Sequence, residues 1–476
     1  MKEKDLFENK SVLSAVLSMA LPSIVGQIIL VIYNIADTLF VGLTENAILI
    51  NAVTICMPAY MILTAISNLF GVGGSSVISR SLGKGKPDRA KRASSFAFWG
   101  CLSLSLIYCG VVALFAPQIA DMLGAHGDQE TIAHAALYLR IAVAAFGVPT
   151  AINSLFSHLI RSQGFGFHAS FGIGLGGILN VLLDPLFIFV ICGVENAALG
   201  AAIATGLSNF IALLYYVFLF IFGKKVSVNL MPRKSIFSEG LPKEILLVGL
   251  PACLMTLFEN ISYAILGNQM GSLSPEALTG VEVAKKVNMF AHNAVRGMAQ
   301  GVLPLIGYNK SSGNRKRMKQ VVLVSGAISL GIALVAATIN AIPFSGRALI
   351  SLFLHGEVAN LEARQQFGYW FLLLFSIGAP FSAIAYTVIS FFQAVGKAWR
   401  SLILALLRKG ILDIPLMFIL QAVAASDFKP YSIVMATPIA DALCCAVAIF
   451  LFAHYISRHG QNKPAKQSAS IEPSVQ

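Results

Sequence analysis

The chain has 476 residues, of which 57% are hydrophobic and only 12% are charged, and its mean hydropathy is +0.76. Soluble domains carry about twice that share of charged residues, so the composition excludes a soluble protein and indicates one that crosses a membrane several times. The net charge of +12 does not indicate a nucleic-acid partner, because the Lys and Arg residues lie in short runs between apolar blocks. That pattern is typical of loops beside a lipid bilayer.

Apolar runs of about 20 residues or more, the length needed to cross a bilayer, recur along the whole chain. They predict an all-α polytopic membrane protein with twelve transmembrane helices, near residues 13–41, 47–72, 94–116, 132–158, 169–192, 197–222, 244–268, 279–307, 321–344, 367–394, 400–424 and 432–456. Residues 1–222 are predicted to form an N-terminal lobe and residues 244–456 a C-terminal lobe. The polar segment 223–243 is predicted to be a cytoplasmic linker, and residues 457–476 a disordered cytoplasmic tail.

The distribution of Lys and Arg predicts the orientation of the chain. The connections at 80–92, 224–243 and 310–319 are strongly basic, whereas the connections between them carry acids such as Asp121 and Glu276. Because basic loops remain on the cytoplasmic side, we expect both termini to be cytoplasmic, in a multi-pass protein of the cell (cytoplasmic) membrane.

The chain repeats itself after about 230 residues. Leu21-Pro22 returns as Leu250-Pro251, and LLDPLFIF at 182–189 returns as ILDIPLMFIL at 411–420. Because each half holds an even number of predicted helices, the two halves point the same way through the membrane. This is the parallel-repeat arrangement of some secondary transporters, and it predicts two six-helix lobes around a central cleft.

Polar residues interrupt the apolar stretch Gly176 to Phe189, which reads GGILNVLLDPLFIF. Asn180 and Asp184 are four residues apart and share one helical face, beside Pro185, which removes a backbone donor. A carboxylate in hydrocarbon is costly, so this pair is a functional-site hypothesis; the alternative is a polar contact between packed helices. Depth along the predicted helices places Asp37 and Thr205 in the same outer half of the membrane, so the four residues could form one cluster.

The C-terminal lobe has its own acids at a similar depth. Glu259, Asp413 and Asp441 lie within predicted helices; Asp413 corresponds to Asp184 in the repeat, and Asp441 to Asn209. Arg408 and Lys409 precede Asp413, so a structural ion pair is an alternative to a role in substrate binding or ion coupling for these acids. Glu282, with Lys285 and Lys286 three and four residues later, predicts a local helix pair.

Buried carboxylates suit a transporter driven by an ion gradient. Burial favours the protonated form of a carboxyl group, so it can take up and release protons, and the same oxygens can bind Na⁺ together with Asn and Thr. No phosphate-binding G-x-x-x-x-G-K-[ST] motif is present, and the His and Cys residues show no metal-ligand or catalytic spacing. The sequence therefore predicts no metal site, no cofactor and no enzyme, but coupling to H⁺ or Na⁺.

Four stretches of the sequence form a recognisable combination: DTLFVG at 37–42, GGSSVISRSLGKGK at 73–86, NVLLDPLFIF at 180–189 and PLIGYN at 304–309. Together they resemble the bacterial branch of the multidrug and toxic compound extrusion (MATE) family. The resemblance implies an antiporter that exports cationic amphiphilic drugs and toxic compounds in exchange for H⁺ or Na⁺, and thereby confers antibiotic resistance. We expect a monomer, because both predicted lobes lie in one chain. It implies a rocking motion with a bend at Pro22 or Pro185.

The resemblance also implies functional residues. An Asp in span 1, an Asn and Asp in span 5 and a Thr in span 6 correspond to Asp37, Asn180, Asp184 and Thr205. Some relatives use a Glu in span 7, here Glu259, together with an Asp in span 10, for which this sequence has no acid between Phe367 and Phe392. The alternative function is a flippase for a lipid-linked precursor, which would need several cationic side chains inside its cavity.

Overall fold

The computed structural model describes residues 2–125, 127–222, 229–231, 234–354 and 359–459, and their regular structure is helical. The first half contains α1 (Lys2–Glu8), α2 (Val12–Gly42), α3 (Ala47–Gly83), α4 (Pro87–Ala120), α5 (Gln129–Tyr138), α6 (Gly147–Arg161), α7 (Gly166–Pro185) and α8 (Ala197–Phe222). The second half contains α9 (Leu241–Leu273), α10 (Pro275–Ser311), α11 (Arg315–Ala341), α12 (Pro343–Ser351), α13 (Leu361–Ala394), α14 (Ala398–Leu406), α15 (Ile414–Val423) and α16 (Lys429–His459).

Within the described residues, nine helical segments are long and apolar enough to cross a membrane, and a tenth is added if the pair 129–145 and 147–161, bent by 48°, counts as one span. The sequence predicted twelve. Two predicted spans do not meet the length and hydropathy expected of a crossing: α10, because it carries several polar and charged side chains, and residues 400–424, because they divide into α14, the π-helical stretch η6 (Leu407–Asp413) and α15. These two segments carry Glu282, Lys285, Lys286 and Arg296 in α10, and Arg408, Lys409 and Asp413 in η6.

The predicted tail is partly wrong. Helix α16 continues to His459, so the first three residues of the predicted tail, from Ser457, are helical. The remaining tail and much of the predicted linker lie outside the described residues. The described end of the linker leads into α9, which begins at Leu241.

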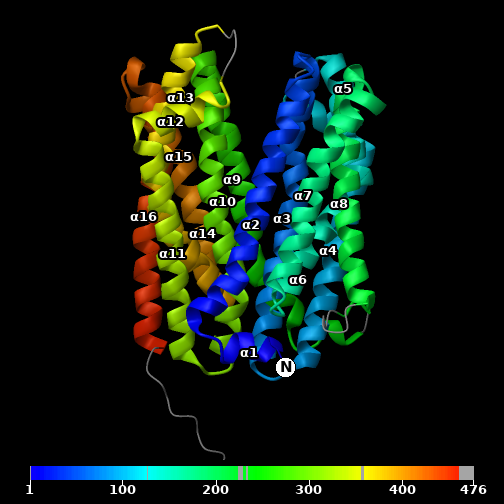
Figure 1. Cartoon of the computed structure of the whole chain (residues 1–476), viewed down its shortest axis with the longest axis vertical. Coiled ribbons are helices and arrows are strands. Elements are labelled where there is room, and N and C mark those ends of the chain that lie inside the picture. Colours follow the sequence, from blue (N-terminus) through cyan, green and yellow to red (C-terminus); the bar gives the residue numbers. More distant parts are fainter. Residues whose placement is uncertain (1, 126, 223–228, 232–233, 355–358, 460–476) are drawn as a thin grey trace, which may run out of the picture.

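The helices stand in two groups that separate towards one end of the molecule and meet at the other (Figure 1). Helices α2 to α8 form one group and α9 to α16 the other, and α1 lies at the end where the groups meet. There α3 packs against α9, and α2 against α10. Large apolar side chains such as Leu114, Phe218 and Phe450 remain exposed on the outside, as expected for a surface covered by lipid.

Glycine allows the two groups to approach closely. A Cβ atom on Gly249 of α9 would overlap the backbone of Leu69 on α3, and one on Gly297 of α10 would lie 2.8 Å from the Cα of Ile24 on α2. Small residues at such crossings let helix backbones touch, which favours tight packing in a membrane. These two contacts hold the halves together at one end and leave the other end free to open.

Candidate functional site

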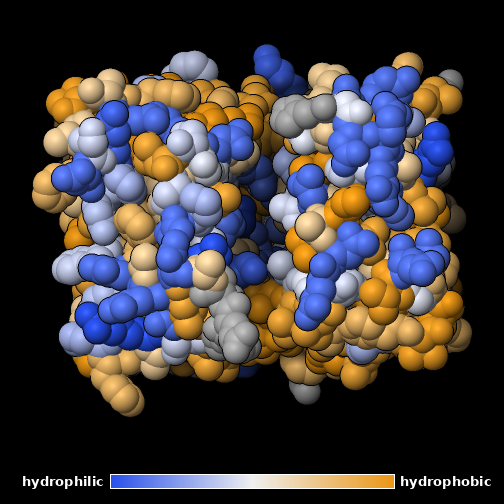
Figure 2. Space-filling view, turned by 90° about the horizontal axis from the view of Figure 1, so that it is seen from above, coloured by the Kyte–Doolittle hydropathy of each residue, from blue (hydrophilic) through white to orange (hydrophobic). Residues whose placement is uncertain are grey.

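A cavity of about 430 Å³ lies between the two halves. It is lined by α2, α3, α6, α7 and α8 from the first half and by α9 and α10 from the second. Figure 2 views the molecule from the end where the two groups of helices separate. The surface is hollowed between the halves, and hydrophilic residues lie inside the hollow. Its size is that of a pocket for a drug-sized molecule.

Helix α7 places the first polar site beside this cavity. One turn of helix separates Asn180 from Asp184, and the Asn180 Nδ2 atom donates hydrogen bonds to Asp184 Oδ1 at 3.0 Å and to Thr205 Oγ1 of α8 at 3.3 Å. The Asp184 side chain is fully buried, and Asn180 lines the cavity. The structure therefore brings three of the four residues predicted in this half into direct contact.

Asp37 approaches the same site from α2. It is 4% exposed and interacts electrostatically with Asp184 across the contact between α2 and α7. Asp37 Oδ1, Asn180 Oδ1 and Asp184 Oδ2 are buried and accept no hydrogen bond from the described part of the chain. Buried oxygens without donors are costly, so this group of oxygens, which we call the N-lobe acid site, is suited to hold a proton or a small cation.

The helix changes its hydrogen-bonding pattern at this site. After Pro185 the chain continues as the π-helical stretch η3 (Leu186–Ile191), in which Cys192 N donates to Phe187 O at 3.0 Å. Proline supplies no backbone N–H, which loosens the regular ladder. Local π-helical turns are often found at functional sites.

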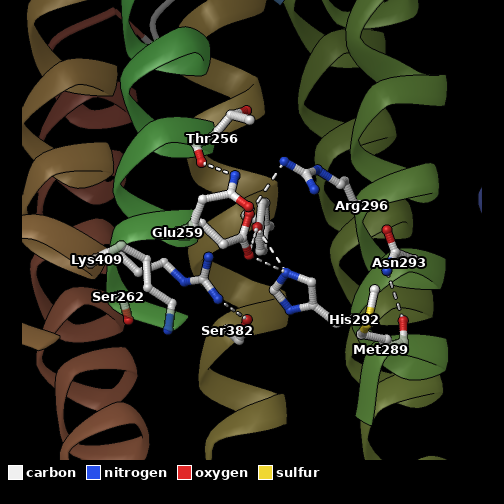
Figure 3. A network of polar contacts seen from close by, with 12 residues as sticks. Thr256, Glu259, Ser262, Met289, His292, Asn293, Arg296, Ser382 and Lys409 are labelled. Carbon is white, nitrogen blue, oxygen red and sulfur yellow. Dashed lines mark hydrogen bonds and ion pairs between the residues drawn. The ribbon is translucent and has the colours of Figure 1, made fainter. Parts of the chain in front are cut away.

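The acids of the second half are paired instead. Figure 3 shows Glu259 of α9 pointing towards His292 and Arg296 of α10. Glu259 Oε1 lies 2.9 Å from His292 Nε2, and Glu259 Oε2 lies 3.4 Å from Arg296 Nη2. The Tyr386 hydroxyl from α13 lies 3.0 Å from the same His292 nitrogen. Both carboxylate oxygens of Glu259 therefore have partners.

Asp413 and Asp441 each have a buried cation. Lys409 Nζ lies 2.8 Å from Asp413 Oδ2, which also accepts a hydrogen bond from Ser262 Oγ at 2.6 Å. The other oxygen of Asp413 accepts one from Thr437 Oγ1 at 2.9 Å. These contacts are those of the structural ion pair that the sequence left open for Asp413.

Arg408 completes the network of the second half. Its Nε atom lies 2.7 Å from Asp441 Oδ1, its Nη2 atom donates to Ser382 Oγ at 2.9 Å, and its guanidinium lies 4.3 Å from the centre of the Tyr386 ring. Tyr386 thus links the pair of Arg408 and Asp441 to Glu259 and His292. We use the name C-lobe ion network for the linked residues Glu259, His292, Arg296, Tyr386, Arg408, Lys409, Asp413 and Asp441.

Sequence reasoning missed the partner of Glu259. It gave the His residues, His292 among them, no role because they show no metal-ligand or catalytic spacing. The signal was the short connection at Ser274 between α9 and α10. Antiparallel neighbours joined by a tight turn bring residues at similar distances from the turn side by side, which applies to Glu259 and His292.

Two groups of helices around a central cavity, with buried ionisable groups in each, are typical of a membrane transporter. The MatE family model matches residues 22–186 and again residues 251–419, so the matches begin at Pro22 and Pro251, the prolines of the repeat. The chain belongs to the MATE family, whose members are transporters and not enzymes.

Curated and solved relatives agree with this assignment. "Multidrug export protein MepA" of Staphylococcus aureus (strain MRSA252) is 30% identical over 462 residues, which cover 95% of this chain and 96% of that protein. The fold matches a structure described as an outward-facing conformation of a multidrug resistance MATE family transporter of the MOP superfamily, with a TM-score of 0.84, 23% identity and coverage of 96% of this chain and 98% of that one. It also matches MATE in complex with MaL6, with a TM-score of 0.85, 22% identity and coverage of 96% and 99%.

Proposed function

We propose that this protein is an antiporter that exports cationic amphiphilic drugs and toxic compounds, driven by H⁺ or Na⁺. The observation that carries the proposal is the N-lobe acid site, where oxygens of Asp37, Asn180 and Asp184 are buried beside the cavity without donors from the described residues. The similarity to a multidrug export protein supports drugs as the cargo.

The topology proposed is two lobes of six spans each, with α10 and the segment from α14 to α15 as the two additional crossings. Polar groups on these helices need not contact lipid, since they line the cavity or pair within the bundle. The basic connection at 80–92, which leads from α3 to α4, supports a cytoplasmic position for the end where the two groups of helices meet, and with it for both termini. The cavity then opens outwards, and one chain, a monomer, contains a complete pathway.

The proposed mechanism uses the N-lobe acid site as the coupling point. Entry of a proton or Na⁺ satisfies the unpaired oxygens, and the change in charge acts on α7 where Pro185 and η3 already depart from a regular helix. The cargo leaves outwards as the halves rock about the close contacts at Gly249 and Gly297. The C-lobe ion network, whose acids are all paired, serves as a structural element of the second half.

One observation favours the alternative of a lipid flippase. Lys285, Lys286 and Arg296 all line the cavity, as a site for a pyrophosphate group would require. However, Lys285 pairs with Glu282 and Arg296 with Glu259, so two of these cations already have acidic partners. Antiport of a soluble drug is therefore the better supported function.

The test is efflux from proteoliposomes loaded with ethidium, a cationic dye, under an imposed proton gradient and then a sodium gradient. We expect one gradient to drive efflux in the wild type and in Asp427→Asn, a control at an exposed acid. Asp184→Asn should abolish the response to that gradient. Failure of both gradients in the wild type, together with transbilayer movement of a labelled polyprenyl pyrophosphate, would establish the flippase instead.

A further inference from the structure

The charged residues on the cavity wall all come from the second half. They are Glu259, Glu282, Lys285, Lys286 and Arg296, of α9 and α10. Glu259 pairs with Arg296 at 3.4 Å, and Glu282 Oε1 lies 2.5 Å from Lys285 Nζ. Lys286 forms no ion pair with any residue in the described ranges. It is therefore the one positive charge on this wall that no described acid pairs with.

The excess positive charge on this wall does not depend on which lysine Glu282 contacts. Lys285 and Lys286 lie three and four residues after Glu282 on the same face of α10, and one carboxylate cannot neutralise two ammonium groups. With both histidines on the wall neutral, the five charged side chains carry a formal charge of +1. One cation remains in need of an anionic partner in a cavity partly shielded from water.

The opposite wall has the complementary character. The lining residues of the first half are neutral, such as Tyr33, Asn34 and Thr38 of α2, while Asp37 and Asp184 are buried behind them. The cavity is therefore polarised, with unpaired acids behind one wall and an unpaired ammonium group on the other. A molecule with a positive and a negative end would be held in one orientation across it.

We propose that Lys286 is a carboxylate-binding subsite of the export cavity, and that the preferred cargo consists of amphiphiles that carry a carboxylate together with a cationic amine. The inference rests on the proposed export function and names its substrate class. A carboxylate supplies the hydrogen-bond acceptor and the charge that Lys286 lacks, and such charge-assisted hydrogen bonds are roughly twice as strong as neutral ones.

Two dyes that differ in one group test this subsite. Rhodamine 110 has a free carboxylate, and rhodamine 123 is its methyl ester. Binding to the purified protein in nanodiscs is measured by fluorescence polarisation. We expect the wild type to bind the acid more tightly than the ester, and Lys286→Gln to weaken binding of the acid by about tenfold while changing binding of the ester by less than about twofold.

Three further variants fix the interpretation. Lys286→Arg should retain the preference for the acid, and Lys84→Gln, at an exposed lysine outside the cavity, should leave both affinities unchanged. Glu282→Gln removes the acid that offsets one of the two lysines, so it should strengthen binding of rhodamine 110. Opposite effects of the two cavity variants would be difficult to obtain from misfolding.

Equal affinity of the wild type for the two dyes, or equal losses of both in Lys286→Gln, would overturn the subsite. Export is measured separately. If the preference for the acid holds in binding but no gradient drives efflux of either dye, the proposed antiport fails while the subsite stands.

Discussion

The two halves of this transporter contain the same carboxylate in two different settings. Asp184 and Asp413 occupy equivalent places in the repeat, each in or beside a π-helical stretch. Four residues before Asp184 the chain has Asn180, and four residues before Asp413 it has Lys409. The amide leaves the charge of Asp184 uncompensated, whereas the ammonium group at 2.8 Å neutralises Asp413.

A duplicated fold can therefore place different functions in its two halves. A buried carboxylate without a neighbouring cation is costly in its charged form, so uptake of a proton or a metal cation stabilises it. A buried carboxylate that has a cation and two hydroxyl donors is already stabilised in its charged form, so it gains little from taking up a proton. Thr205 and Thr437 are also equivalent, but Thr205 accepts from Asn180 while Thr437 donates to Asp413. We therefore propose that the first half couples transport to the ion and that the acids of the second half stabilise the fold.

Making the first half resemble the second should have the strongest effect on transport. Asn180→Lys would place an ammonium group beside Asp184 and occupy the oxygens proposed to receive the coupling ion. We expect a folded protein that loses gradient-driven efflux by more than about tenfold, a change of at least about 1.4 kcal/mol. Efflux from proteoliposomes measures it, with Asn180→Gln as the control that keeps the amide.

The converse change acts on stability. Asp413→Asn leaves Lys409 buried without its acid, and breaking such a pair costs about 3–5 kcal/mol. We expect a lower melting temperature for the purified protein, and a restored one in the double variant Lys409→Met, Asp413→Leu, which buries no charge. A single variant as stable as the wild type would argue against the structural role of this pair.

Glu259→Gln should have an intermediate effect. It removes the acid between His292 and Arg296, so Arg296 loses its ion-pair partner and the protein is destabilised. Because the N-lobe acid site is untouched, we expect efflux per folded molecule to remain within about threefold of the wild type, less than about 0.7 kcal/mol. Loss of the gradient response at full stability would show that the second half also couples.

The smallest expected effect on stability concerns the end of the molecule where the two groups of helices meet. There Glu239 lies between Arg89 and Arg92 of α4. The hydrogen bond from Arg92 lowers the pKa of Glu239 below its ordinary value of 4.5. A lowered pKa in the folded state adds stability above the unfolded pKa, and this is lost as the pH falls through the folded value. Glu239→Gln should therefore melt slightly below the wild type at pH 7, and the difference should shrink as the pH falls below 4.5 and vanish below the folded pKa. A difference that persists in acid would point to packing as its cause.

Local patterns in the sequence predicted much of this arrangement. Helix geometry alone places Asn180 and Asp184 on one face. Comparison of residues 182–189 with 411–420 relates Asp184 to Asp413. Contacts between distant helices could not be derived in this way, because they depend on tilt and packing. The position of Lys286 on the cavity wall and the neutralisation of Asp441 by Arg408 are of this kind.

The sequence predicted twelve membrane spans, whereas nine helical segments of the described residues, or ten with the bent pair, are long and apolar enough to be clear crossings. Helix α10 and the segment from α14 to α15 account for the difference, because they are too polar or too broken, and they carry Lys286, Arg296 and Lys409. Polar residues inside a bundle weaken the sequence signal at the positions where function is concentrated.

The most direct test of the division between the halves compares two variants in one experiment. Proteoliposomes containing Asp184→Asn, or the double variant Lys409→Met, Asp413→Leu, are loaded with ethidium and given the gradient that drives the wild type. Asp184→Asn should lose the gradient response, and the double variant should keep it. If the double variant folds normally but loses the response while Asp184→Asn retains it, coupling belongs to the second half and not to the first.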